Sequence, residues 1–141
     1  MGGLTMGFTT PCFIRKNTEE LRKKLEDIGY AAKFSTKDHD VIYAEATFGV
    51  YFTMFSSNIP QLMSFSYDCG ENEALFLAIA ALRDDSNYMQ WFICTEDYIE
   101  SPDKEWKVGD WDLNTCPDVT YGQQLPHWRK ATVEELINHF K

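Results

Sequence analysis

The chain has 141 residues, of which 44% are hydrophobic and 15% are aromatic. This length suits one domain with its own core, and this apolar content excludes intrinsic disorder, which requires low hydrophobicity. The formal net charge is -9, from 13 Lys and Arg against 22 Asp and Glu, so the average field repels phosphates and anionic lipid surfaces. The composition therefore argues against general nucleic-acid binding and membrane binding, and we interpret the negative charge as an aid to solubility.

We predict that residues 1–7 form a flexible leader outside the folded domain. The N-terminus contains neither the basic nor the apolar region of a signal peptide. No segment is long and apolar enough to cross a bilayer. We therefore expect a single domain over residues 8–141, located in the cytoplasm.

Residues 8–15 are rich in β-branched and aromatic side chains and predict a strand, in which Pro11 suits an edge position or the first residues. Asn17 stands three residues before Glu20, the spacing of a capping box, and predicts the start of a helix that ends at Gly29. The buried stripe of this helix is expected to consist of Leu21, Leu25 and Ile28.

Residues 30–68 predict strands that follow one another in a meander. Residues 30–34 predict a short strand, and residues 41–46 and 50–55 predict a hairpin. A further half-buried strand is predicted where apolar and polar side chains alternate. The apolar members of this alternation are Met63, Phe65 and Tyr67.

Residues 74–82 contain only Ala, Leu, Phe and Ile, and a helix without a polar face must be buried. A buried strand is the alternative, but four alanines in a run of this length favour a helix. Asn72 is the expected N-cap and Arg83 the expected cation of the last turn. We expect the rest of the chain to pack around this helix.

Residues 88–95 predict a nearly apolar, central strand. Residues 96–118 predict a long acidic loop with a short strand over residues 107–113. Thr132, with Glu135 at the capping-box spacing, predicts a final amphipathic helix. The predicted fold is a single α+β domain with an antiparallel sheet of about five strands, a buried central helix and two amphipathic helices near the termini.

The sequence contains no decisive chemical motif, and we expect neither a metal ion nor a cofactor. The four cysteines include no C-x-x-C pair, the three histidines share no ligand spacing, and glycine-rich phosphate loops are absent. Cys12 and Cys94 lie in apolar runs and predict small buried thiols.

The most suggestive feature is an acidic stretch rich in aromatic side chains. Its rings are Tyr98, Trp106, Trp111 and Tyr121, with Trp128 just beyond. Flat rings beside charges are common at recognition surfaces, and we predict Trp106, Asp110 and Trp111 as contacts to a binding partner. The alternative is that these rings fold inward and attach a long loop to the sheet.

The stretches PCFIRKNTEELRKKLEDIGY, ALFLAIAALRDDSNYMQWF and WRKATVEELINHFK lie at both ends and in the middle of the chain. Together they resemble a group of small uncharacterised proteins from gut bacteria and their phages or mobile elements. This resemblance implies a phage or mobile-element accessory protein, and it implies no activity and no site residue.

We predict a non-enzymatic module that binds another protein. One alternative is a counter-defence protein that sequesters a small signalling molecule in a sheet-lined pocket. Another is a small hydrolase or transferase that uses Cys69 or His127. The sequence leaves the oligomeric state open.

Overall fold

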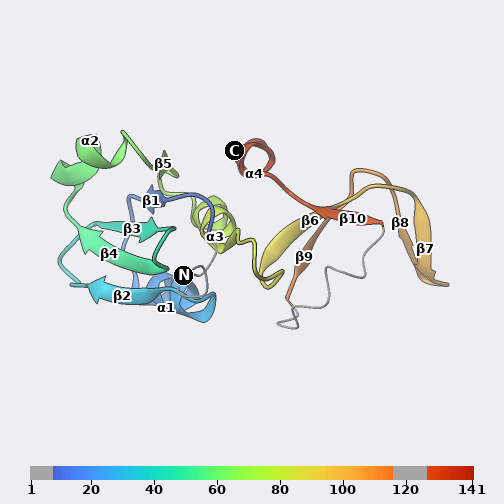
Figure 1. Ribbon diagram of the computed structural model, residues 1–141, viewed down its shortest axis with the longest axis horizontal. Helices are drawn as coiled ribbons and strands as arrows, with labels where there is room; N and C mark the ends of the chain where they lie inside the picture. The colour runs from blue at the N-terminus through green and yellow to red at the C-terminus, as the bar shows by residue number, and fades with distance from the viewer. Residues whose placement is uncertain (1–7, 116–126) are drawn as a thin grey trace.

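The computed structural model describes residues 8–115 and 127–141 (Figure 1). The predicted leader over residues 1–7, as well as Cys116 and Tyr121, lies outside the described residues. The described chain is mixed α+β, which confirms the predicted fold class. Its helices are α1 (Glu19–Asp27), the short 3-10 helix η2 (Ser56–Asn58), α2 (Ile59–Leu62), α3 (Glu73–Ala81) and α4 (Val133–Phe140). Its strands are β1 (Cys12–Ile14), β2 (Ala31–Phe34), β3 (Val41–Glu45), β4 (Val50–Met54), β5 (Tyr67–Asp68), β6 (Gln90–Cys94), β7 (Tyr98–Ser101), β8 (Lys104–Trp106), β9 (Trp111–Asn114) and β10 (Trp128–Lys130).

Five strands form a mixed sheet in the order β2-β4-β3-β1-β5. The predicted hairpin of β3 and β4 is confirmed, and β1 is antiparallel to β3, but β2 runs parallel to β4 and β5 runs parallel to β1. The prediction of a purely antiparallel sheet is therefore wrong. The reason is that helices precede both parallel strands: α1 lies between β1 and β2, and η2 and α2 lie between β4 and β5. A helical connection allows the chain to enter the sheet again in the same direction.

The predicted half-buried strand over residues 63–68 is confirmed only at its end, in β5, and is wrong for the residues before it. The chain forms α2 and then continues in helical turns, in which the Ser66 N–H donates to the Leu62 carbonyl at 3.0 Å. Pro60 in the first turn of α2 favours this helix, because a proline there leaves no hydrogen bond unmade. Only the two residues of β5 join the sheet.

α3 is the buried helix predicted from residues 74–82. The Oδ1 of its N-cap, Asn72, accepts from the Leu75 N–H at 3.1 Å, and the side chains of Phe76 and Ile79 are fully buried. The helix contacts β1, α1, α4 and β6. It therefore lies between the five-stranded sheet and the remaining strands (Figure 1).

Two of the predicted helix ends are wrong, whereas the N-caps predicted for α3 and α4 are confirmed. The N-cap of α1 is Thr18, whereas Asn17 donates to backbone carbonyls of the loop before β3. Arg83 lies beyond the last turn of α3 and donates to the carbonyl of the C-cap residue of α1 at 3.0 Å. At α4, the capping box of Thr132 and Glu135 is present.

The predicted acidic loop over residues 96–118 contains three strands. β7 and β8 form a two-stranded hairpin, and β9 and β10 flank β6 in an antiparallel three-stranded sheet. Gly109, with a φ of 92°, allows the turn before β9. The predicted short strand over residues 107–113 overlaps β9. β7 and β8 are short and carry several charged side chains, so their apolar alternation was too weak to indicate them. The central position predicted for the strand in residues 88–95 is confirmed for β6.

Candidate functional site

Asp110, one of the three predicted contacts, belongs to the turn before β9. Its Oδ2 accepts from the Lys107 N–H at 2.9 Å, and its carbonyl accepts from the Cys94 N–H at 2.8 Å. The carboxylate thus closes the turn that brings β9 alongside β6. The hydrogen bonds of this side chain serve the fold of the chain around it.

Trp106 lies on β8 in a cluster of rings with Tyr98 and Trp128. It meets Trp128 edge to face, with ring centroids 4.8 Å apart and 81° between the planes. Its Nε1 donates to Glu100 Oε1 at 2.8 Å, and the Lys104 Nζ lies 3.9 Å from its ring centroid. The Trp128 Nε1 donates to the Tyr98 hydroxyl at 2.7 Å. These contacts attach the β7–β8 hairpin to β10, as the alternative interpretation of the aromatic stretch predicted.

Trp111 lies on β9 and stacks on His139 of α4, with ring centroids 3.9 Å apart and 14° between the planes. It is paired with Ile93 of β6, whereas Trp128 is paired with Cys94, the next residue of the same strand. Successive residues of a strand point to opposite faces, so Trp111 and Trp128 lie on opposite faces of the three-stranded sheet. The three predicted contacts therefore do not form one surface.

The two residues of the predicted hydrolase alternative lie in different surroundings. Cys69 is buried, and burial together with the neighbouring Cys69 thiol raises the pKa of Cys12 well above its usual value. His127 stacks on Tyr98 with ring centroids 4.4 Å apart, and its Nδ1 lies 2.5 Å from Glu96 Oε1. The two side chains thus belong to separate clusters, and they do not pair as nucleophile and base.

Across residues 8–115 and 127–141, no group of three or more His, Cys, Asp or Glu side chains is arranged to hold a metal ion. None of the helices in these two ranges is both long and apolar enough to span a membrane.

A row of aromatic side chains crosses the outer face of the five-stranded sheet, which is the face away from α1 and α3. The register places Phe34 of β2 beside Phe52 of β4, and Phe52 opposite Tyr43 of β3. Phe34 and Tyr43 both stack on Phe52, with centroid distances of 5.9 and 6.0 Å. Phe65, in the turn after α2, meets Tyr43 edge to face at 5.8 Å. We call Phe34, Tyr43, Phe52 and Phe65 the outer aromatic face.

Within residues 8–115 and 127–141, the outer aromatic face is covered at one end only. α2 packs against the end formed by β1 and β3, where Tyr43 is 6% exposed. No described helix covers this side of β2 and β4, where Phe34 is 66% exposed and Phe52 is half-buried. Phe65, in the turn after α2, is 55% exposed. Single exposed apolar residues are ordinary, but a connected group of large rings on a protein surface commonly marks an interaction site.

The outer aromatic face was not predicted, although β4 carried a signal for it. A strand with one face in water alternates apolar and polar side chains. The outward side chains of β4 are Val50, Phe52 and Met54, and the inward ones are Tyr51 and Thr53. Because the outward side chains of β4 are apolar, the strand indicates a second apolar face, where a sheet with one face in water would carry polar side chains. The sequence did not indicate that Phe65 is exposed, because Phe65 was predicted to be a buried side chain of a strand.

Comparisons of the chain with protein-family models, with curated proteins and with solved structures gave no match. The assignment of a site therefore rests on the geometry of the chain itself.

Proposed function

We propose that this protein is a non-enzymatic binding module that takes a protein partner on the outer aromatic face. The observation that supports this proposal is the exposure of Phe34 and Phe65 beside the half-buried ring of Phe52. Aromatic side chains carry a large share of the binding energy at protein interfaces, because they bury much area at a small entropic cost.

The expected partner is a protein with an apolar contact surface and a basic rim. The net charge of -9 attracts a partner of opposite charge, and the loop before β3 adds Asp38 and Asp40 near one end of the sheet. Bases of a single-stranded nucleic acid also stack on exposed rings. Their phosphates, however, would meet the repulsive field of an acidic protein, so a protein is the better occupant.

The face of the sheet, and not its edge, is the proposed contact. All four residues of the edge strand β2 are exposed, and Lys33 lies within this strand. A lysine on an edge strand opposes the addition of a strand from another chain. A partner that lies across the rings of β2 and β4 avoids this obstacle.

Site-specific photo-cross-linking in an extract of the host cells tests the proposal. A benzophenone amino acid replaces Phe34, and in matched chains it replaces Phe48 or Trp106. Phe48 is the control, because it is also 66% exposed but lies in the turn between β3 and β4. We expect a protein partner, identified by mass spectrometry, to be cross-linked from position 34 and not from position 48.

Two results would contradict the proposal. A cross-link from position 106 alone would assign the interface to the aromatic stretch that contains the predicted contacts Trp106, Asp110 and Trp111. A cross-link between two copies of the chain from position 34 would show that the face serves self-association.

The affinity for the identified partner provides a second test. Phe34→Ser is expected to weaken binding more than about tenfold, as truncation of a central aromatic contact does. Phe48→Ser is expected to leave the affinity unchanged. Near-ultraviolet circular dichroism of both variants confirms that the fold is retained, and equal affinities of the two variants would contradict the role of Phe34.

The other predicted functions and the resemblance to phage or mobile-element proteins remain predictions. Sequestration of a small signalling molecule, and hydrolysis or transfer at Cys69 or His127, do not require the outer aromatic face. The cross-linking result therefore distinguishes them from the proposed function.

A further inference from the structure

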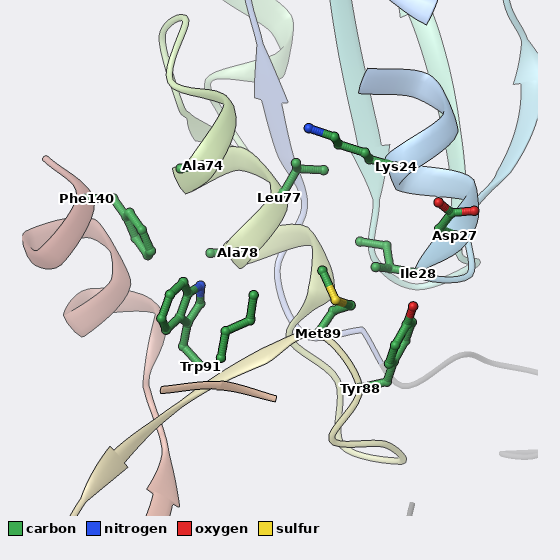
Figure 2. A pocket seen from close by; sticks show the side chains of 11 residues that line it. Lys24, Asp27, Ile28, Ala74, Leu77, Ala78, Tyr88, Met89, Trp91 and Phe140 are labelled. Atoms are coloured by element: carbon green, nitrogen blue, oxygen red, sulfur yellow. The ribbon is translucent and has the colours of Figure 1, made fainter. Parts of the chain in front are cut away.

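A pocket of about 310 Å³ lies on the opposite side of the five-stranded sheet from the outer aromatic face, where α1, α3 and α4 meet β6 and β9 (Figure 2). The apolar side chains that line it include Ile28, Leu77, Ala78, Trp91, Leu113 and Phe140. This volume equals that of about ten water molecules at about 30 Å³ each. Mostly apolar pockets of about 300 Å³ or more are typical of small-molecule sites.

Met89 lines the pocket with an unusual backbone conformation. Its φ is 58°, and no other non-glycine residue within residues 8–115 and 127–141 has a positive φ. The left-handed region is unfavourable for a residue with a side chain. The Met89 N–H donates to the Asn114 carbonyl at 2.7 Å, and the side chain points toward α3 between Trp91 and Tyr88 (Figure 2). Backbone strain of this kind is concentrated at binding sites.

Two hydrogen-bond donors at the pocket, the Lys24 Nζ and the Trp91 Nε1, have no hydrogen-bond or ion-pair partner among the described residues. Figure 2 shows the Lys24 side chain reaching from α1 toward Leu77 of α3, and the indole nitrogen of Trp91 turned toward α3. The adjacent Lys23 differs, because its Nζ lies 3.7 Å from Glu19 Oε1. Lys24 is exposed and Trp91 is half-buried, so both donors are accessible to a ligand that brings an acceptor to the edge of the pocket.

We propose that this pocket binds a small apolar monocarboxylate, such as a straight-chain fatty acid of about eight carbons. The hydrocarbon chain lies against the apolar walls, and the carboxylate pairs with Lys24. The Trp91 N–H offers a second donor to the bound molecule. A charged hydrogen bond at the border of an apolar pocket is stronger than one in open water.

The charged residues of the pocket favour a single negative charge on the ligand. Among the described residues that line it, Lys24 is the one cationic side chain, and the other charged residue is Asp27. The Asp27 side chain lies beside Ile28, away from α3 (Figure 2), so it does not compete for the same position. A phosphate group carries up to two charges and is usually held by several donors, whereas the described lining offers the single cation of Lys24.

Isothermal titration calorimetry with octanoate, octylamine and octanol tests the proposal, because the three probes share one chain and differ in the charge of the head group. We expect octanoate to bind at least tenfold more tightly than octylamine. Lys24→Gln is expected to weaken octanoate binding about tenfold and to leave octanol binding unchanged. Lys23→Gln is the matched control, because it removes the same charge one residue away from the pocket and is expected to have little effect.

A second variant blocks the pocket itself. Ala74 is exposed and lines the pocket in the first turn of α3, so Ala74→Trp fills the space without disturbing the core. This change is expected to abolish octanoate binding, while the proton–nitrogen NMR spectrum confirms the fold. Phe34→Ser is expected to leave octanoate binding unchanged, which separates this inference from the proposed function.

Several results would overturn the inference. These are no octanoate binding at about 1 mM, equal or tighter binding of octylamine, and equal effects of Lys24→Gln and Lys23→Gln. Octanoate binding that survives Ala74→Trp would place the ligand elsewhere on the protein.

Discussion

At the scale of single residues, hydrogen-bond partners decide what a polar side chain does. Both carboxylate oxygens of Glu135 accept from the guanidinium of Arg129 at 2.7 Å, and Oε1 also accepts from the Thr132 N–H at 2.9 Å. The bonds from Arg129 and from the Thr132 backbone lower the pKa of Glu135 to about 2. The carboxylate of Asp110 similarly accepts a hydrogen bond within its own turn, from the Lys107 N–H. This bond explains why Asp110 does not form one surface with Trp106 and Trp111.

The pKa of Glu135 is expected to depend on Arg129. Because the folded-state pKa lies below the unfolded value, the stabilisation is complete above about pH 4.3 and is lost as the pH falls toward 2. Arg129→Gln is expected to raise the pKa of Glu135 toward about 4.3, as measured by NMR titration of its carboxyl carbon. Arg15→Gln, which removes the ion pair with Asp68, is the control. An unchanged pKa in Arg129→Gln would contradict the assigned cause.

At the scale of elements, the positions of the helices agree more closely with those predicted from the local sequence than the positions of the strands do. α3 and α4 begin at the predicted N-caps, and α1 begins one residue after the predicted one. The strands β7 and β8 lie in a predicted loop, and residues 63–66 turn helically where a strand was predicted. A cap bond joins residues three apart, whereas a strand needs a partner that is distant in the sequence.

The N-cap of α1 gives a test at this scale. Thr18→Ala is expected to lower the free energy of unfolding by about 1 kcal/mol, because the Thr18 Oγ1 no longer accepts from the Leu21 N–H. Urea denaturation measures the change. Thr18→Ser retains the hydroxyl and is expected to lose much less. An equal loss in both variants would assign the effect to the methyl group and not to the cap.

At the scale of the whole molecule, α3 joins two groups of strands, because it contacts both β1 of the five-stranded sheet and β6 of the three-stranded sheet. The four tryptophans all belong to the three-stranded sheet or to the β7–β8 hairpin. They are Trp91, Trp106, Trp111 and Trp128. Tryptophan fluorescence therefore reports on one part of the molecule, whereas far-ultraviolet circular dichroism reports on the whole chain.

Tryptophan fluorescence and far-ultraviolet circular dichroism are expected to follow one unfolding curve in urea, because α3 packs against both the five-stranded and the three-stranded sheet. Ile79→Val, at a fully buried position of α3, is expected to lower the free energy of unfolding by about 1 kcal/mol in both signals. Ile99→Val, on β7 where the side chain is 72% exposed, is the control and is expected to have little effect. Different midpoints for fluorescence and circular dichroism would show that the two parts unfold separately.

The candidate surfaces were harder to predict than the fold class. Trp106 and Trp111 were predicted as contacts because aromatic and acidic residues are close together in the sequence. In the structure, Trp106 packs on Trp128, which lies on the opposite face of the three-stranded sheet from Trp111. The outer aromatic face joins rings from β2, β3, β4 and the turn after α2. Its members are separated in the sequence, so no local pattern connects them.

The sequence by itself determined the α+β class, the buried helix α3, the capped helix α4 and the β3–β4 hairpin, because capping, apolar runs and tight turns act over a few residues. Only the tertiary structure decided that β2 and β5 pair in parallel, that a second sheet exists, and that rings of separate strands meet on one uncovered face. The pocket likewise requires five elements to meet. The physical reason is that pairing and burial depend on which distant segments come together, and local preferences do not encode that choice.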